Sequence, residues 1–300
     1  MRLRVVGLVL AGAFLAGCGG QSPAVPRAET PLPPGASAVG PSASVRADPV
    51  ALVGLWKLAV DGEPEDTVLR VSGEGDLAVF GRCTSLTGSW QANTEGQFLG
   101  NLNGFSVNAR IRECPLAGKQ PTDADFMPAW LGRVAGFRVD GKERLLLDQS
   151  GATVARLMPG AVPTPRSDLL PEMTGVPVVT DEIREQLRAV AVPLPSPLQP
   201  ATTGTLLGRW QPAGKDVGAY VEFKANGQWT GSDGCNGEGG RWTAGAAGSF
   251  LALAGPTTLI GCANVPVGAW LSEASRAGLD GAELVLVDGG GKELGRLSRR

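Results

Sequence analysis

An internal repeat constrains this chain more than any other sequence feature. Short motifs from the first half of the chain return in the second half in the same order. The matched pairs include Leu52-Val53-Gly54-Leu55-Trp56 with Leu206-Leu207-Gly208-Arg209-Trp210, Cys83 with Cys235, Gly88-Ser89-Trp90 with Gly240-Arg241-Trp242, and Phe98 with Phe250. Because tryptophan motifs and a cysteine keep their order, the sequence predicts two copies of one domain, at residues 51–158 and 204–298.

The spacing between matched residues shows where the copies differ in length. It is 152 residues from Cys83 to Cys235, 148 from Cys114 to Cys262, and 140 from Trp130 to Trp270. The length changes fall between the matched blocks, where loops are expected.

Each copy has the pattern of a small antiparallel sheet with one helix. Residues 220–223 and 283–287 alternate polar and apolar side chains, and Asn226-Gly227 is typical of a tight hairpin turn. Asp148 and Asp288 match between the copies and are interpreted as hairpin-turn residues. The expected helices carry Trp130, Leu131 and Val134 in the first copy, and Trp270, Leu271, Ala274 and Ala277, ended by Gly278, in the second. The predicted fold class is mainly β (α+β), with two tandem small barrel-like antiparallel sheets and one packed helix in each.

The N-terminus has the pattern of an export signal. A cationic start, Met1-Arg2-Leu3-Arg4, precedes an apolar run, Val5–Phe14, that is shorter than the roughly twenty residues needed to span a bilayer. Leu15-Ala16-Gly17-Cys18 then resembles the bacterial lipobox. The resemblance implies that residues 1–17 are a lipoprotein signal peptide and that Cys18 carries a diacylglycerol anchor. The mature chain is then expected on the extracytoplasmic face of the cell membrane, held there by its lipid.

Two proline-rich segments flank the first copy. Residues 18–50 show no apolar period and are expected to form a disordered tether. Residues 159–203 predict a linker with one short helix, capped by Thr180, whose apolar face comprises Ile183, Leu187, Val190 and Ala191.

Composition excludes several classes of function. The chain contains no histidine, which excludes Ser–His–Asp and Cys–His catalysis and histidine-ligated metal sites within it. A formal net charge of −2 is not the basic footprint of a nucleic-acid-binding protein. The sequence has no phosphate-binding loop and no Gly-x-Ser-x-Gly elbow. We therefore expect no cofactor, no metal and no catalytic activity.

The four cysteines other than Cys18 fall two in each copy, at matching places. In an oxidising compartment this arrangement predicts the disulfide bonds Cys83–Cys114 and Cys235–Cys262. Pairing between the copies stays open, although it would couple two domains across a flexible linker. A zinc site of four thiolates is not favoured, because no close Cys-x-x-Cys pair exists.

Motifs along most of the second copy resemble the META domain of HslJ-like bacterial proteins. They are Leu207-Gly208-x-Trp210, Phe223-x-x-Asn226-Gly227, Gly231-x-x-Gly234-Cys235-Asn236, Gly240-x-Trp242 and Thr257-Thr258-Leu259-Ile260-Gly261-Cys262. The first copy departs from the pattern, since Gly81-Arg82-Cys83-Thr84 replaces Gly-Cys-Asn. The resemblance implies a compact sheet-and-helix fold in envelope proteins linked loosely to stress tolerance, with no established catalytic mechanism.

The polar loop at residues 232–238 supplies the candidate ligand-facing residues. Asp233, Asn236 and Glu238 carry oxygen atoms that suit a hard cation, but their spacing does not match an EF-hand loop, and turn chemistry explains them better. Trp229 has no tryptophan counterpart in the first copy, where Leu77 stands, so it is the candidate for a surface role.

These features favour a lipid-anchored envelope protein with a non-catalytic binding or structural role. Its expected partners are the membrane, reached through Cys18, and an unknown envelope protein or small ligand. The alternatives are an inhibitor of a wall-degrading or proteolytic enzyme, and a carboxylate-based hydrolase, which needs two acidic residues converging in a pocket.

Overall fold

The computed structural model describes residues 46–108, 126–166, 169–214, 218–258, 260–261 and 264–299. The expected signal peptide, Cys18, Cys114 and Cys262 lie outside the described residues. Residues 45–300 form one compact unit that contains both copies of the repeat. The expected fold class is confirmed, because the described chain is mainly β and forms two antiparallel sheets.

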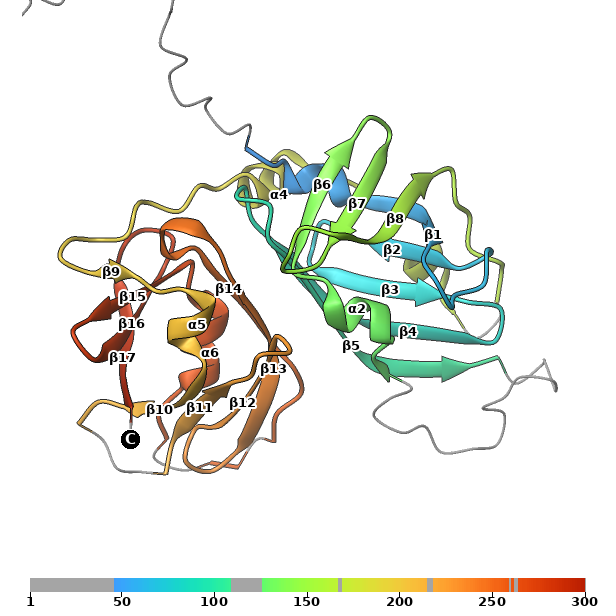
Figure 1. The fold of residues 1–300 in the computed structure, drawn as a ribbon. Helices are drawn as coiled ribbons and strands as arrows, with labels where there is room; N and C mark the ends of the chain where they lie inside the picture. Colours follow the sequence, from blue (N-terminus) through green and yellow to red (C-terminus); the bar gives the residue numbers. More distant parts are fainter. Residues whose placement is uncertain are drawn as a thin grey trace, which may run out of the picture. The chain divides into compact units, whose positions relative to one another are not determined.

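The first sheet contains eight antiparallel strands, drawn from blue to green in Figure 1. Their order across the sheet is β5-β4-β3-β2-β1-β8-β7-β6. The strands are β1 Gly54–Ala59, β2 Val68–Val71, β3 Asp76–Phe80, β4 Thr84–Ala92, β5 Phe98–Val107, β6 Gly136–Asp140, β7 Glu143–Leu147 and β8 Thr153–Pro159.

The second sheet repeats this order strand for strand and adds one short strand at its edge. The order is β14-β13-β12-β11-β10-β17-β16-β15-β9. The strands are β9 Gln199–Pro200, β10 Gly208–Pro212, β11 Tyr220–Phe223, β12 Gln228–Ser232, β13 Gly237–Ala244, β14 Phe250–Ala254, β15 Arg276–Asp280, β16 Glu283–Val287 and β17 Glu293–Arg299. Two sheets with the same topology are what a duplicated domain should produce.

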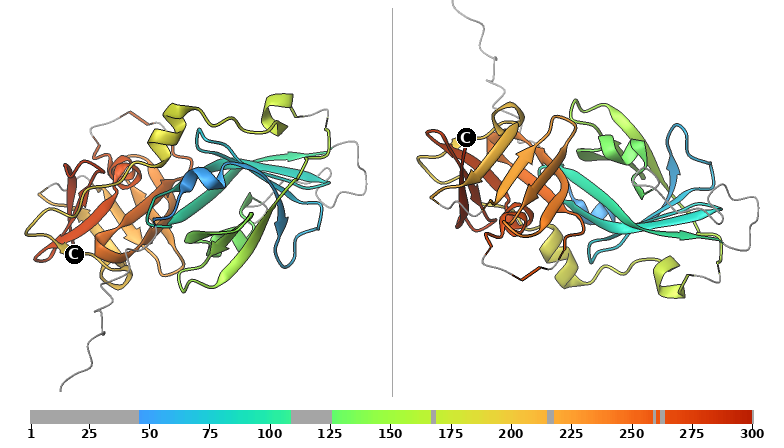
Figure 2. Two further views of the ribbon diagram at one scale, coloured as in Figure 1. Left: turned by 90° about the horizontal axis from the view of Figure 1, so that it is seen from above. Right: turned by 90° about the horizontal axis from the view of Figure 1, so that it is seen from below.

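Each sheet is twisted and curled, as the views in Figure 2 show. A single bridge between Gln97 and Gly136 joins the ends of the first sheet, and a bridge between Ser249 and Arg276 joins the β14 end of the second sheet to β15, next to the edge strand β9. The bridges fall at the same place in the two copies. Because each end-to-end contact is one isolated bridge, the sheets are curled but not continuously hydrogen-bonded barrels.

Matched tryptophans make the same hydrogen bonds in both cores. Trp56 Nε1 donates to the Leu52 carbonyl at 2.7 Å, and Trp210 Nε1 donates to the Leu206 carbonyl at 2.7 Å. Both donors are buried, so the bond satisfies the polar edge of a ring whose body packs in the core. The carbonyls belong to short helical turns before the first strand of each copy, η1 Pro49–Leu52 and α5 Thr203–Leu206.

The expected hairpin turns are also observed. The Asp148 carboxylate accepts hydrogen bonds from the backbone N–H groups of Ser150 and Ala152, at 2.8 and 3.0 Å. Asp288 does the same for Gly290 and Lys292, at 2.9 Å each. Both aspartates therefore shape turns, as the sequence predicts.

A matching helix in each copy packs on the sheet, but both helices are shorter than predicted, because Val134 and Ala274 lie just beyond their ends. The helices are α2 Ala129–Arg133 and α6 Val267–Glu273. The prediction that Ala277 lies on the helix and that Gly278 ends it is wrong, because both belong to strand β15. A Cβ at Gly278 would lie 2.8 Å from Leu194 Cδ2 and 3.0 Å from Leu198 Cβ, so the linker packs closely on this strand.

The linker between the copies is packed against both of them. Its helices are α3 Pro171–Thr174 and α4 Asp181–Leu187, and Thr180 caps α4 by accepting from the Ile183 N–H, as predicted. Val190 and Ala191 lie beyond the end of α4, so the expected helical face is only partly right. Arg188 binds the Asp48 carboxylate with Nε and Nη2, at 3.1 and 2.6 Å. The expected disordered tether, residues 18–50, is therefore wrong at its end, because Asp48 pairs with the linker and caps η1.

Candidate functional site

The polar loop between β12 and β13 is organised around Asp233. One carboxylate oxygen accepts from the backbone N–H groups of Cys235 and Asn236, at 2.8 and 2.6 Å. The other accepts from the side-chain amides of Asn236 and Asn264, at 2.9 and 2.7 Å. Burial alone would raise the pKa of Asp233, but these four donors outweigh it and hold the pKa well below its usual range.

Asn236 joins this loop to the segment before α6. Its Oδ1 accepts from Thr258 Oγ1 at 2.8 Å and from the Ile260 N–H at 2.7 Å, while its Nδ2 donates to the Ile260 carbonyl at 3.1 Å. Asp233 and Asn236 are 4% and 5% exposed. The expectation that they face a ligand is therefore wrong, because their polar atoms are used to brace the loop.

Trp229 is buried, so its expected surface role is also wrong. The side chain is 1% exposed and belongs to the core of the second copy. A Cβ at Gly240 would lie 2.0 Å from the Leu253 carbonyl oxygen and 2.9 Å from Trp229 Nε1, so glycine lets β14 and the indole approach closely there. The alternation along β12 is the sequence signal for an inward-facing tryptophan.

Glu238 is the only candidate residue of this loop with a partly exposed side chain. Its carboxylate lies over Gly268 at the start of α6, and its Oε2 is buried without a hydrogen-bond partner among the described residues. Burial, followed by the negative charge of Asp233, raises the pKa of Glu238. The matching residue in the first copy is Leu86, which lies in the apolar core.

Cys83 and Cys235 each take part in a disulfide bond. Their expected partners, Cys114 and Cys262, lie outside the described residues. The pairing within each copy therefore remains a prediction. In the first copy Gly81 and Thr84 stand where Asp233 and Asn236 stand in the second, so that loop lacks the carboxylate that organises its counterpart.

No sequence pattern predicts the surface where the two copies meet. There Ser249 Oγ donates to Gln97 Oε1 at 2.5 Å, and Asn93 Nδ2 donates to the same oxygen at 2.6 Å. Beside this polar centre Leu99 packs with Leu251 and Leu253. Gln97 matches Ser249 and Leu99 matches Leu251 at the repeat spacing of 152 residues, so equivalent residues touch each other. This is the contact pattern of a two-fold interface, formed within one chain.

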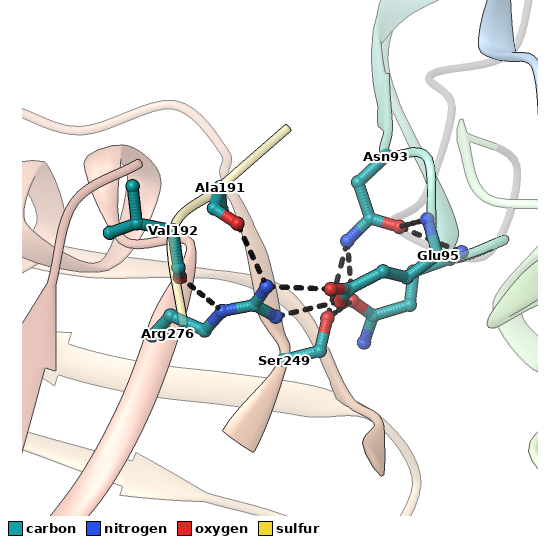
Figure 3. A network of polar contacts seen from close by, with 7 residues as sticks. Asn93, Glu95, Ala191, Val192, Ser249 and Arg276 are labelled. Atoms are coloured by element: carbon teal, nitrogen blue, oxygen red, sulfur yellow. Dashed lines mark hydrogen bonds and ion pairs between the residues drawn. The ribbon is translucent and has the colours of Figure 1, made fainter. Parts of the chain in front are cut away.

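Two buried arginines of the second copy add contacts that have no equivalent from the first copy. Arg276, which is 5% exposed, binds the Glu95 carboxylate at 2.6 and 2.8 Å and donates to the Val192 carbonyl of the linker at 3.1 Å (Figure 3). Its counterpart in the first copy is Gly136, which forms no such pair. The bidentate geometry joins the first copy, the linker and the second copy through one side chain.

Arg241 makes the second contact of this kind. Its Nη1 and Nη2 donate to the carbonyls of Leu131 and Val134, at 2.7 and 3.1 Å, at the end of α2 in the first copy. A cation suits the carbonyl end of a helix. Burial lowers the pKa of Arg241 to about 10, and the side chain remains charged at neutral pH.

Comparisons with protein-family models, with curated proteins and with solved structures found no match to this chain. Within the described ranges, no group of three or more Cys, Asp and Glu residues is arranged to hold a metal ion. No described helix is both long and apolar enough to cross a membrane.

Proposed function

We propose that this chain is a lipid-anchored cell-envelope protein that acts by binding or by structural support rather than by catalysis. The lipobox-like Leu15-Ala16-Gly17-Cys18 supports a membrane anchor on Cys18, and the proline-rich residues that follow support a tether. The motifs of the second copy support a relation to META-domain proteins, with the first copy as a degenerate module.

The non-catalytic proposal is supported by the structural role of the buried polar residues. The side chains of Asp233 and Asn236 form hydrogen bonds that stabilise a loop. Arg276 and Glu95 form an ion pair that joins the copies. Buried polar networks of this kind rigidify a structure and fix one arrangement of its parts. Two modules held in a fixed arrangement suit a protein that presents a surface or a cavity to a partner.

The anchor is tested by labelling cells that produce the chain with radioactive palmitate. We expect label on the full chain, and no label on the Cys18→Ser variant. The Cys83→Ser variant is the control, because it removes a cysteine of the folded part and leaves the lipobox intact. An unlabelled full chain, or equal label with and without Cys18, contradicts the proposal.

The absence of catalysis is tested on peptide, glycan and ester substrates. We expect no turnover above the buffer rate. Glu74 and Asp76 are the acidic residues to substitute first, because both line the same cavity. A reproducible hydrolytic rate that is lost in the Glu74→Gln or Asp76→Asn variant would establish the carboxylate-based hydrolase instead.

A second function, inhibition of a wall-degrading or proteolytic enzyme, is favoured by one exposed segment. Val176 and Val178 of the linker are each 74% exposed, on extended chain between α3 and α4. Apolar side chains presented in this way suit insertion into the substrate cleft of another enzyme. Inhibition of an envelope hydrolase that is lost in the Val176→Asp variant, and kept in Val162→Asp, would support this function.

A further inference from the structure

We propose that a cavity bounded by the two copies and the linker binds a small organic cation, an ammonium or guanidinium group on an apolar body. The proposal rests on the binding role argued above and names the site and the ligand class. The cavity has a volume of about 660 Å³, within the range of pockets that hold small ligands.

Three parts of the chain form the walls. The first copy contributes residues 73–76 and 89–95, the linker contributes residues 186–187 and 189–191, and the second copy contributes Phe250, Leu251, Leu253, Ser275 and Gly289. The cavity therefore requires the docked arrangement of the two copies and does not belong to either copy alone.

The charge of the lining selects a cation. Glu74, Asp76 and Glu95 line the cavity, and none of its described lining residues is a lysine or an arginine. Arg276 pairs with Glu95. Glu74 and Asp76 form no ion pair within the described part of the chain, so their negative charge is not neutralised by the protein. A concave surface of one charge attracts ligands of the opposite charge.

The rest of the lining suits an apolar body attached to that cation. Trp90, Leu187 and Val190 line the cavity together with the leucines of β14. Val190 is 46% exposed, although it is apolar. Apolar ligand surface placed against these side chains leaves water, which favours binding. A purely inorganic cation would gain nothing from this part of the lining.

The linker wall is held in position by contacts with both copies. Arg188 binds Asp48 with two hydrogen bonds, and a Cβ at Gly73 would lie 2.6 Å from Ile183 Cγ2, so α4 packs closely on the first copy. Arg276 fixes Ala191 and Val192 through their carbonyls. A site whose walls are set before the ligand arrives loses less free energy in ordering them.

The proposal is tested with three probes of similar size and different charge. 2-Phenylethylamine, neutral 2-phenylethanol and anionic 3-phenylpropionate are titrated into the full chain, and binding is followed by ligand-observed NMR. We expect the amine to bind at least fivefold more tightly than the alcohol, and the acid to bind least.

Variants assign the binding to this cavity. We expect the Glu74→Gln/Asp76→Asn double variant to weaken binding of the amine about fivefold, in line with the modest worth of exposed charge pairs, with an unchanged circular dichroism spectrum. The matched control is Asp61→Asn/Glu65→Gln, which removes two acidic residues from a different cavity of the first copy and should leave the amine affinity unchanged. No binding of the amine, equal binding of the three probes, or equal loss in both double variants overturns the proposal. Palmitate labelling of Cys18 does not depend on this cavity, so failure here and failure of the anchor are separate results.

Discussion

Gln97 and Ser249 occupy the same position in the two copies, and a hydrogen bond of 2.5 Å joins their side chains. In a symmetric homodimer, a residue near the two-fold axis meets its own counterpart in the same way. This chain forms the equivalent contact within itself, and Arg276 and Arg241 add contacts that only one copy can supply. The Arg276 pair distinguishes the two modules, because the residue of the second copy that matches Glu95 is Ala247, which has no carboxylate.

Removing Glu95 should weaken the contact between the copies. In Glu95→Ala the buried guanidinium of Arg276 loses its carboxylate, and we expect the free energy of unfolding to fall by about 1.5–3 kcal/mol, measured by urea denaturation. Glu143→Ala is the control, because its pair with Arg156 is exposed and should contribute less than about 1 kcal/mol. Equal losses in the two variants would show that the Arg276 pair has no special structural role.

Asp233 should stabilise the loop of the second copy. Asp233→Ala removes the acceptor of four hydrogen bonds, and we expect a loss of about 2–3 kcal/mol in urea denaturation. Because the folded pKa lies below the unfolded value of 3.8, this stability is present above pH 3.8 and is lost as the pH falls toward the folded pKa. A loss below about 0.5 kcal/mol at neutral pH would show that the network does not hold the loop.

Glu238 should make stability depend on pH in the opposite direction. Its folded pKa is raised above the unfolded value of 4.5, so the folded state binds the proton more tightly. The contribution of Glu238 to stability is then greatest below pH 4.5 and is lost as the pH rises through its folded pKa. We expect the Glu238→Gln variant to lack this part of the fall when melting temperatures are compared from pH 4 to pH 8. Parallel curves for the two proteins would contradict the raised pKa.

The cysteine pairing is expected to stay within each copy. Peptide mapping by mass spectrometry of the unreduced chain should recover the linked pairs Cys83–Cys114 and Cys235–Cys262. The reduced chain, digested in the same way, identifies the four separate peptides. A linked Cys83–Cys235 peptide would show instead that the copies are joined covalently.

Local patterns account for most of the fold. Alternation predicts β11 and β16, Asp148 and Asp288 predict turns, and Thr180 predicts the start of α4. The prediction fails where the same residue pattern suits both a helix and a strand. Ala274 and Ala277 suit a helical face, but the crossing of Leu194 over Gly278 belongs to a strand, and only the folded chain brings these residues together.

The docking surface could not be predicted for a different reason. Gln97 and Ser249 are ordinary polar residues of two turns, and Arg276 and Glu95 are 181 residues apart in the chain. The alternation of polar and apolar residues along the sequence does not predict contacts between such distant residues. For Trp229, the lack of a tryptophan counterpart in the first copy is a weaker signal than the alternation along β12, which places the side chain in the core.

The central claim is that the two copies form one docked unit, which both the cavity and the proposed binding role require. Differential scanning calorimetry of the full chain tests it most directly. We expect one transition whose calorimetric and van't Hoff enthalpies agree, and its separation into two transitions in the Glu95→Ala/Arg241→Ala variant. Two independent transitions in the unmodified chain would contradict the claim.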